Sequence, residues 1–307
     1  MGAYLPAPRL EKDLVAGETF ELRYAAASMQ GWRLTNEDAF LVELDLSQRS
    51  SCFGVFDGHS GAEVAQYAAR NFTAVLVANQ RFHTGRLEVT LQETFLQVDE
   101  RLSSAEGQKA LIRLMKGLEE GVEIEETNAH SIAGAAACVA VIRGQQLVVA
   151  SAGDSRAVLA QAGKAIELTT DHKPDSAEEK RRIRRAGGTI EDNRVLGILN
   201  LSRGFGDFEY KRNQDLAQEE QMVTAFPDIK SVKLTKEAQF LVLGTDGVWD
   251  MFSPQECVDF VLARLNKQAL EKTLEELLNA CVTTDVRLSG GIGCDNVTCT
   301  IVQFKAR

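Results

Sequence analysis

Four apolar stretches, each joined to an aspartate, most constrain what this chain can fold into. Each stretch has the composition of a buried strand, and its acid stands where such a strand would reach the edge of a sheet. The pairs are Cys52–Phe56 with Asp57, Gln146–Ala152 with Asp154, Gln239–Gly244 with Asp246, and Asn296–Gln303 with Asp295. Because strands of one architecture can share a rim, the sequence predicts that these carboxylates meet.

Each acid taken alone has a simpler explanation, since Asp-Gly pairs are common in turns. The set as a whole favours a metal centre, because clustered carboxylates repel one another and a hard divalent cation with oxygen ligands neutralises them. The spaced acids and closing Glu of a calcium loop are absent, and no His/Cys spacing typical of zinc occurs. The pattern therefore predicts a carboxylate-built metal site, with His59 as a titratable neighbour of Asp57.

Strand-like and helix-like segments come in groups rather than in alternation. The strand-like segments are Leu22–Ser28, Ala39–Leu44, Cys52–Phe56, Ala137–Ile142, Gln146–Ala152, Ala157–Gln161, Ser231–Leu234, Gln239–Leu243 and Asn296–Gln303. The amphipathic helix-like segments are Gly61–Asn79, Leu87–Leu102, Pro254–Leu265 and Leu270–Val282. Short turns between strands predict hairpins, so the fold class is α+β, with antiparallel sheets flanked by pairs of helices.

Bulk composition limits the partners and the domain count. No Pro- or Ser-rich linker divides the 307 residues, so we expect one domain over residues 1–307 and, by default, a monomer. The net charge of −10 argues against nucleic acid as the main partner. Six scattered cysteines without a secretory signal predict reduced, buried thiols and a cytoplasmic location, with the nucleus as an alternative. The acidic stretch Gly117–Asn128 is expected to be a surface loop.

Membrane association depends on the N-terminus, because no stretch is long and apolar enough to span a bilayer. Gly2 permits myristoylation, but Pro6 replaces the Ser or Thr usual four residues later. A single acyl chain would give only marginal binding. We therefore expect membrane contact only if Gly2 is acylated.

Two basic features fit a phosphorylated ligand. Arg33 offers a planar, permanently charged fork for two phosphate oxygens, and Glu37 and Asp38 add carboxylates close by. A short basic helix follows Glu178 and ends at Gly187-Gly188. Such a helix is most often a solvated face, but beside a metal site it can attract phosphorylated segments.

Together these motifs resemble the metal-dependent protein phosphatase family, the type 2C Ser/Thr phosphatases. The motifs occur in the same order as in the family, from about Leu22 to Phe304. Any one motif alone is weak evidence for the family, whereas the ordered set is highly specific. The matching segments are Met29–Arg33 with Glu37-Asp38, Val55–Gly61, Ala152–Arg156, Asp171–Pro174, Glu179-Lys180 with Arg182-Ile183 and Ala186–Gly188, Leu201–Arg203 with Gly206-Asp207, Thr245–Asp250, and Asp295–Thr298.

The resemblance implies a fold, a metal centre and roles for single residues. The fold would be two antiparallel β-sheets packed as a sandwich with helices outside. Asp57 would bridge two Mg²⁺ or Mn²⁺ ions. The further ligands would be the Gly58 carbonyl, Asp246 and Asp295 directly, and Glu37 and Asp38 through waters. Asp154, Asp246 and Asp250 resemble a weaker third-metal site.

The resemblance also implies a mechanism without a phosphoenzyme. A metal-bridging hydroxide would attack the phosphomonoester of phosphoserine or phosphothreonine in protein substrates. Arg33 would orient the phosphate, and His59 would donate a proton to the leaving alkoxide. Residues 173–213, called the flap segment below, would lie beside the site and select substrates.

The chain departs from the family pattern at two places. Gly134-Ala135-Ala136-Ala137 replaces a segment that usually carries Ser or Thr hydroxyls, and Asn200 replaces a small apolar residue. A catalytically weak or inactive member that serves as a binding module is therefore the alternative hypothesis. A hydrolase of another phosphoester, such as a nuclease, is a third, although the acidic charge argues against it.

Overall fold

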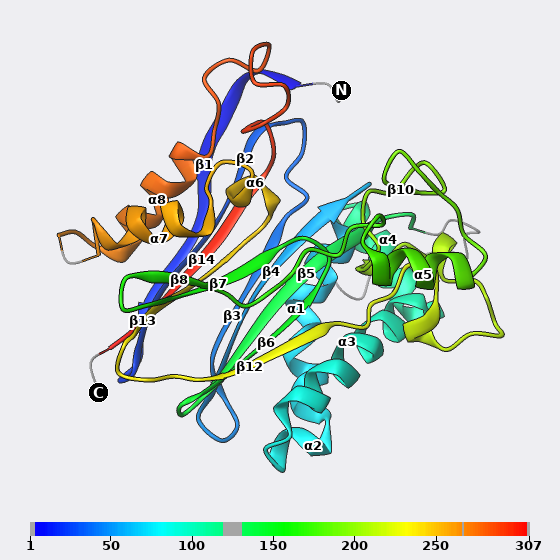
Figure 1. The fold of residues 1–307 in the computed structure, drawn as a ribbon, viewed down its shortest axis with the longest axis horizontal. Helices are drawn as coiled ribbons and strands as arrows, with labels where there is room; N and C mark the ends of the chain where they lie inside the picture. The colour runs from blue at the N-terminus through cyan, green and yellow to red at the C-terminus, as the bar shows by residue number, and fades with distance from the viewer. Residues whose placement is uncertain (1–3, 119–130, 266, 306–307) are drawn as a thin grey trace.

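Two antiparallel sheets form the centre of the computed structural model, which describes residues 4–118, 131–265 and 267–305 (Figure 1). The first sheet has the order β1 (Tyr4–Glu18), β2 (Leu22–Arg33), β14 (Val297–Phe304), β13 (Ala238–Gly244), β7 (Arg156–Gln161) and β8 (Lys164–Glu167). The second has the order β12 (Asp228–Lys233), β6 (Gln146–Ala152), β5 (Gly134–Arg143), β4 (Ser50–His59) and β3 (Ala39–Leu46), and β11 (Phe205–Gly206) also pairs with β5.

Helices cover the outer face of each sheet. The first sheet carries α7 (Pro254–Leu262) and α8 (Leu270–Ala280), and the second carries α1 (Glu63–Ala78), the short α2 (Gln80–His83), α3 (Leu87–Ser103) and α4 (Ala105–Met115). A capping box between Ser253 and Glu256 opens α7, with Pro254 at its first position. The predicted α+β fold with two flanked antiparallel sheets is confirmed.

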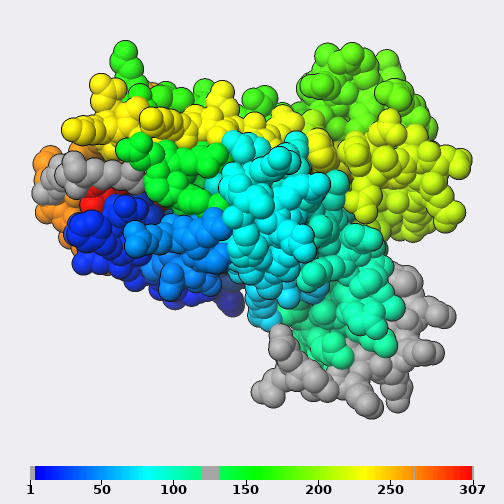
Figure 2. All heavy atoms as spheres, turned by 90° about the horizontal axis from the view of Figure 1, so that it is seen from below, coloured from blue at the N-terminus to red at the C-terminus, as the bar shows by residue number. Residues whose placement is uncertain are grey.

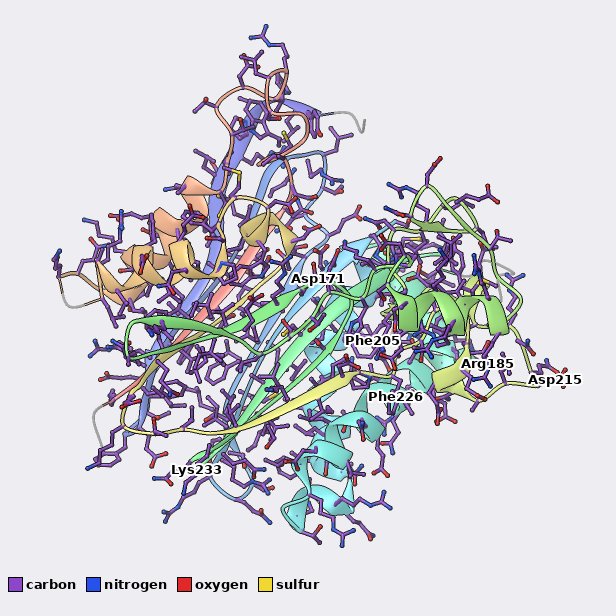
Figure 3. All side chains as sticks on the ribbon, in the orientation of Figure 1. Asp171, Arg185, Phe205, Asp215, Phe226 and Lys233 are labelled. Atoms are coloured by element: carbon purple, nitrogen blue, oxygen red, sulfur yellow. The ribbon has the colours of Figure 1, made fainter. Side chains whose placement is uncertain are left out.

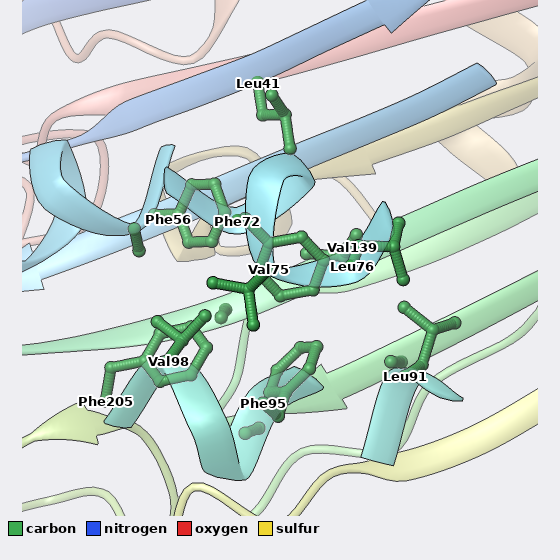
Figure 4. Close-up of a cluster of buried hydrophobic side chains, with 14 of the residues drawn as sticks. Leu41, Phe56, Phe72, Val75, Leu76, Leu91, Phe95, Val98, Val139 and Phe205 are labelled. Carbon is green, nitrogen blue, oxygen red and sulfur yellow. The ribbon is translucent and has the colours of Figure 1, made fainter. Parts of the chain in front are cut away.

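The central strands are apolar on both faces because each lies between a helical layer and the other sheet. In β4, Phe53 and Val55 pack between the sheets, whereas Cys52 and Phe56 face the helices. Phe56 lies in a cluster of aromatic rings under α1 and α3 (Figure 4). Two buried faces explain why these strands appear as unbroken apolar runs in the sequence.

Among the described elements, two that are longer than ten residues were not predicted from the sequence. The first is β1, whose prolines at positions 6 and 8 argue against a strand; it lies at the sheet edge, where a missing ladder donor is tolerated. The second is α4, which adds a helix to the layer over the second sheet. The predicted acidic loop Gly117–Asn128 falls almost entirely outside the described residues.

The flap segment stands as a lobe (light green to yellow-green) beside the helices of the second sheet (Figure 2). Its main helix is α5 (Ala177–Arg185), and in Figure 3 Arg185 lies at the outer part of this lobe while Phe205 lies where the lobe meets the sheets. Apolar residues of the segment pack on Ala136 of β5. The segment therefore has a small core of its own that joins it to the sheet.

A buried ion cluster around Glu179 fixes α5. The Glu179 carboxylate accepts hydrogen bonds from Arg203 (2.7 Å to Nη2), from Arg182 (2.8 Å) and from the Ser202 hydroxyl (2.5 Å). Burial raises the pKa of Glu179, but the hydrogen bond from Arg203 and the charges of Arg182 and Arg203 outweigh it and lower the pKa to about 2. The cluster therefore ties α5 to the segment that carries Ser202 and Arg203, just before β11.

This shift predicts how acid acts on the fold. A carboxyl whose pKa is lower in the folded state stabilises the protein fully above its unfolded pKa of 4.5, and this stability is lost as the pH falls through about 2. We expect the urea midpoint of unfolding to fall as the pH drops below about 4.5. A Glu179→Gln variant cannot ionise at this position, so its urea midpoint should be lower at neutral pH and should fall less as the pH drops. An identical pH dependence of the midpoint in both proteins would contradict the assignment.

The six cysteines are all buried and unpaired, as predicted. Among the described helices, none has the length and apolar composition needed to cross a membrane.

Candidate active site

A cavity of about 360 Å³ lies where the acid-bearing strand ends meet. Most of the residues predicted for the site line this cavity: Arg33, Glu37, Asp57, Gly58, His59, Asp154, Asp246 and Asp295. They come from the end of β2 and the loop after it, from β4 and from the turn after β6. The remaining two come from the start of the short helix α6 (Asp246–Trp249) and from the turn before β14. The tertiary structure thus brings together residues that are up to 262 positions apart, the separation of Arg33 and Asp295.

Three carboxylates form the centre of the cavity. Oxygens of Asp57, Asp154 and Asp246 all lie within 4.8 Å of one another. Burial raises the pKa of Asp57 and of Asp246 well above the usual range, and the neighbouring carboxylates raise them further. A divalent cation requires several converging oxygen ligands and neutralises the repulsion between buried carboxylates. These three acids meet both conditions, so they fit a metal site.

Glycines allow the segments of the site to approach closely. A Cβ added at Gly58 would lie 2.2 Å from the carbonyl oxygen of Glu37, and one at Gly247 would lie 2.1 Å from that of Asn296. Both obstacles are backbone atoms, which cannot move aside as a side chain can. The Asp-Gly pairs are therefore packing requirements of the site as well as turn formers.

Two cationic side chains already pair with acids of the cavity. Arg33 donates from Nη2 to Asp295 Oδ2 at 2.6 Å, and Lys173 forms an ion pair with Asp154. The Arg33 side chain is 48% exposed, so its remaining donors reach the solvent side of the cavity. Arg33 thus has one fixed end and one end free for an anion.

Asp38 and Asp250, two of the predicted metal-site acids, are not among the residues that line the cavity. Asp38 is buried behind it and accepts a hydrogen bond from the Thr245 hydroxyl at 3.0 Å. Burial is the largest cause that raises the pKa of Asp38 to about 8. Asp250 is exposed one turn beyond Asp246. Both acids are therefore placed around the central cluster rather than in it.

Asn296 is a site residue for which sequence reasoning gave no role. Its side chain donates to the carbonyl oxygens of Gln30 (2.8 Å) and Thr35 (2.9 Å) and accepts from the Glu37 amide (3.0 Å). It therefore ties the loop that carries Arg33 and Glu37 to the strand end that carries Asp295. The signals in the sequence were its position directly after a predicted ligand and its place in the matching segment Asp295–Thr298.

Comparison with known proteins identifies the family. A model of the protein phosphatase 2C family matches residues 22–287. The chain belongs to the protein phosphatase 2C family. It is 43% identical over 306 residues to "Probable protein phosphatase 2C 6" of Paramecium tetraurelia, with 99% of this chain and 100% of that one covered. It is 40% identical over 332 residues to "Probable protein phosphatase 2C 21" of Arabidopsis thaliana, covering 99% and 93%.

Solved structures agree in fold. A phosphatase from Toxoplasma gondii superposes with a TM-score of 0.76 at 24% identity and covers 97% of this chain and 96% of that one. At this identity the likeness speaks for the fold alone. The predicted family and enzyme class, a protein serine/threonine phosphatase, are confirmed by the family match and the curated relatives.

In this phosphatase, His59 has a partner that the sequence analysis did not assign. His59 Nε2 lies 3.0 and 2.9 Å from the two carboxylate oxygens of Asp207. Burial lowers the pKa of His59, but the hydrogen bond and charge of Asp207 outweigh it, so the pKa is raised. Gly206-Asp207 was part of the family pattern, yet nothing in the sequence linked it to a residue 148 positions away.

Ala136, the departure from the family pattern, lies opposite Asp57 in the β4–β5 register. It is fully buried and packs against Ile183, Leu199 and other apolar residues of the flap segment. A Cβ added at Gly153 would lie only 2.4 Å from the Ala136 methyl group, so space at this point is tight. In this protein Ala136 forms an apolar contact between β5, the neighbour of the strand that carries Asp57, and the flap segment.

Proposed function

We propose that this phosphatase hydrolyses phosphoserine and phosphothreonine in proteins with two divalent ions, Mg²⁺ or Mn²⁺, and without a phosphoenzyme. The observation that carries the proposal is the carboxylate triad Asp57, Asp154 and Asp246 in one cavity with Arg33 and His59. An acid cluster for cations, a guanidinium for a phosphate and an imidazole for a leaving group are the three parts that such a hydrolysis needs.

The ions would be held by Asp57, the Gly58 carbonyl, Asp246 and Asp295, with Glu37 and Asp38 contributing through waters. Bound divalent ions would supply an activated water at neutral pH and neutralise charge on the phosphoryl oxygens. Asp154 and Asp250 would serve a weaker third ion. The ion pair of Lys173 with Asp154 supports the weakness of that site, because a cation would have to displace the ammonium group.

The protein's own groups would do the remaining work. Arg33, anchored on Asp295, orients the phosphate with its exposed donors. His59 gives a proton to the serine or threonine oxygen, which is a poor leaving group unless it is protonated. The flap segment with its basic α5 selects phosphorylated protein segments beside the cavity. We also propose a cytoplasmic monomer.

Phosphate release from a phosphothreonine peptide tests this function. We expect no release in EDTA, release that rises and saturates as Mn²⁺ is added, and loss of release when EDTA is added again. A dinucleotide under the same conditions should remain intact. No release at saturating metal, from a protein shown to be folded, would overturn the proposal in favour of the binding-module hypothesis.

Metal binding can be followed without turnover. A cation that binds only the folded state stabilises it by about 2.7 kcal/mol at a concentration of 100 times Kd. We therefore expect Mn²⁺ to raise the melting temperature. Mg²⁺ should do the same at higher concentration, and K⁺ at equal ionic strength should not. A melting temperature that does not respond to Mn²⁺ would contradict the metal site.

A further inference from the structure

The contact between His59 and Asp207 is built into the site from several sides. His59 is the last residue of β4, and Asp207 follows β11 in a left-handed backbone conformation with φ of 52°. The Asp207 side chain is only 4% exposed, whereas that of His59 is 24% exposed and lines the cavity. The carboxylate therefore lies on the protein side of the imidazole ring, away from the solvent.

Gly134 leaves the space in which this pair meets. It stands opposite His59 in the β4–β5 register. A Cβ at Gly134 would lie 2.2 Å from Asp207 Oδ2 and 2.5 Å from His59 Nε2. Any larger residue would have to push the two groups apart, so the strand is shaped around the pair.

The loop that carries Asp207 is in turn fixed to α3. The Gly206 amide donates to Asp99 Oδ1 at 2.8 Å. Lys211 donates to Asp99 Oδ2 at 2.7 Å and to the Gly204 carbonyl at 2.8 Å. The side chains of Lys211 and Asp99 are only 7% and 12% exposed. A buried ion pair thus holds both ends of the short segment in which Asp207 lies.

We propose that Asp207 is the positioning residue of His59, fixing its Nε2 so that Nδ1 is the nitrogen that serves the leaving group. The inference rests on the proposed phosphatase function. An ionised carboxylate can only accept hydrogen bonds, so Nε2 carries a proton toward Asp207. The other ring nitrogen, Nδ1, is then the one left for the substrate.

The proton balance follows from this arrangement. As an oxygen from water forms a bond to phosphorus, the bond between phosphorus and the serine or threonine oxygen breaks, and the protons of that water leave with the phosphate product. The electron pair of that bond stays on the leaving oxygen, which takes the proton from Nδ1. The ring is left neutral with its remaining proton on Nε2, and Asp207 keeps the ring in place for reprotonation from solvent at Nδ1.

A merely structural role for Asp207 makes a different prediction. If the carboxylate only stabilised the loop, its loss would lower activity on every substrate by a similar factor. A residue that acts through His59 affects only substrates whose leaving group needs a proton. A phosphothreonine peptide needs that proton, and 4-nitrophenyl phosphate does not, so the two substrates separate the roles.

The test compares Asp207→Asn, His59→Ala and the double variant at saturating Mn²⁺. We expect each single variant to lose about 10²-fold in kcat on the phosphothreonine peptide and less than about 5-fold on 4-nitrophenyl phosphate. The double variant should be no worse than His59→Ala. The matched control is Glu93→Gln. Glu93 lies on α3, as Asp99 does, but it pairs with Arg81, so this variant should keep the kcat on both substrates.

Nuclear magnetic resonance of the ring nitrogens gives a readout independent of turnover. In the protein without paramagnetic metal, the Nε2 proton of His59 should be observed in the unmodified chain and lost to exchange in Asp207→Asn. An unchanged Nε2 signal, equal losses on both substrates, or additive losses in the double variant would overturn the inference. Failure of the unmodified protein to hydrolyse the peptide with metal would instead overturn the proposed function.

Discussion

Replacing Asp57 by Asn is expected to reduce phosphate release from a phosphothreonine peptide about 10³-fold or more at saturating Mn²⁺. Asp57 belongs to the carboxylate triad and is proposed to contact both ions, so one substitution damages both metal positions. Asn has nearly the same shape, and the fold should remain. Steady-state kinetics over a range of Mn²⁺ concentrations would measure the loss and show that added metal does not restore it.

Melting temperatures provide the second measurement on this variant. Without metal, Asp57→Asn should melt no lower than the unmodified chain, because the change removes one of several buried acids that repel one another. Its increase in melting temperature on adding Mn²⁺ should shrink. The matched control is Asp45→Asn, an exposed acid of β3 that does not line the cavity and has no proposed metal role, and it should keep the activity. Ordinary turnover by the Asp57 variant would remove its bridging role.

Removing the carboxylate of Glu179 is expected to lower the free energy of unfolding by about 3 to 5 kcal/mol. Glu179 is 2% exposed and is the shared acceptor of two arginines, of which Arg203 is 8% exposed. In Glu179→Ala these guanidinium groups would stay buried without their common counter-charge. Among the described residues, the acidic partner left to Arg203 is Asp228 (2.8 Å).

Chemical denaturation at neutral pH would measure this loss. The neighbouring Glu178 is exposed on the same helix, so Glu178→Ala is a matched control and should change the stability by less than about 0.5 kcal/mol. Similar small effects from both variants would show that the buried cluster does not hold the flap segment. Because Glu179, Arg182 and Arg203 do not line the cavity, the metal-induced rise in melting temperature should survive in Glu179→Ala.

The local sequence pattern was sufficient to predict those strands and helices whose burial is visible in their own residues. The strand of Phe53 and Phe56 is apolar because it is covered on both faces, and that composition is visible without a structure. The amphipathic helices were placed to within a few residues for the same reason, since a buried stripe repeats at the helical period. Asp57 and Asp246 were recognisable because each stands at the end of an apolar run of this kind.

The local sequence pattern did not predict elements whose structure depends on the segments they pack against. β1 lacks a strand-like sequence, yet it pairs along most of β2, since an edge strand needs hydrogen bonds on one side only. α4 was missed because its surroundings, α1 and α3, define its buried face. The packing also decides where Asp38 and Asp250 lie, since neither of them lines the cavity; their predicted metal roles stay predictions.

The sequence by itself determined the α+β class with antiparallel sheets, because strand and helix patterns are visible in each segment. The order of its motifs along the chain determined the family, and the resemblance to that family implied the sandwich. The tertiary structure alone decided which charges face one another: Arg33 with Asp295, Lys173 with Asp154, and His59 with Asp207. Electrostatic interactions act over a few ångströms in space, and residues far apart in sequence reach that range only when the sheets close. The orientation of His59, the proposed proton donor, is therefore decided by the fold, whereas the sequence motif identifies only the residue.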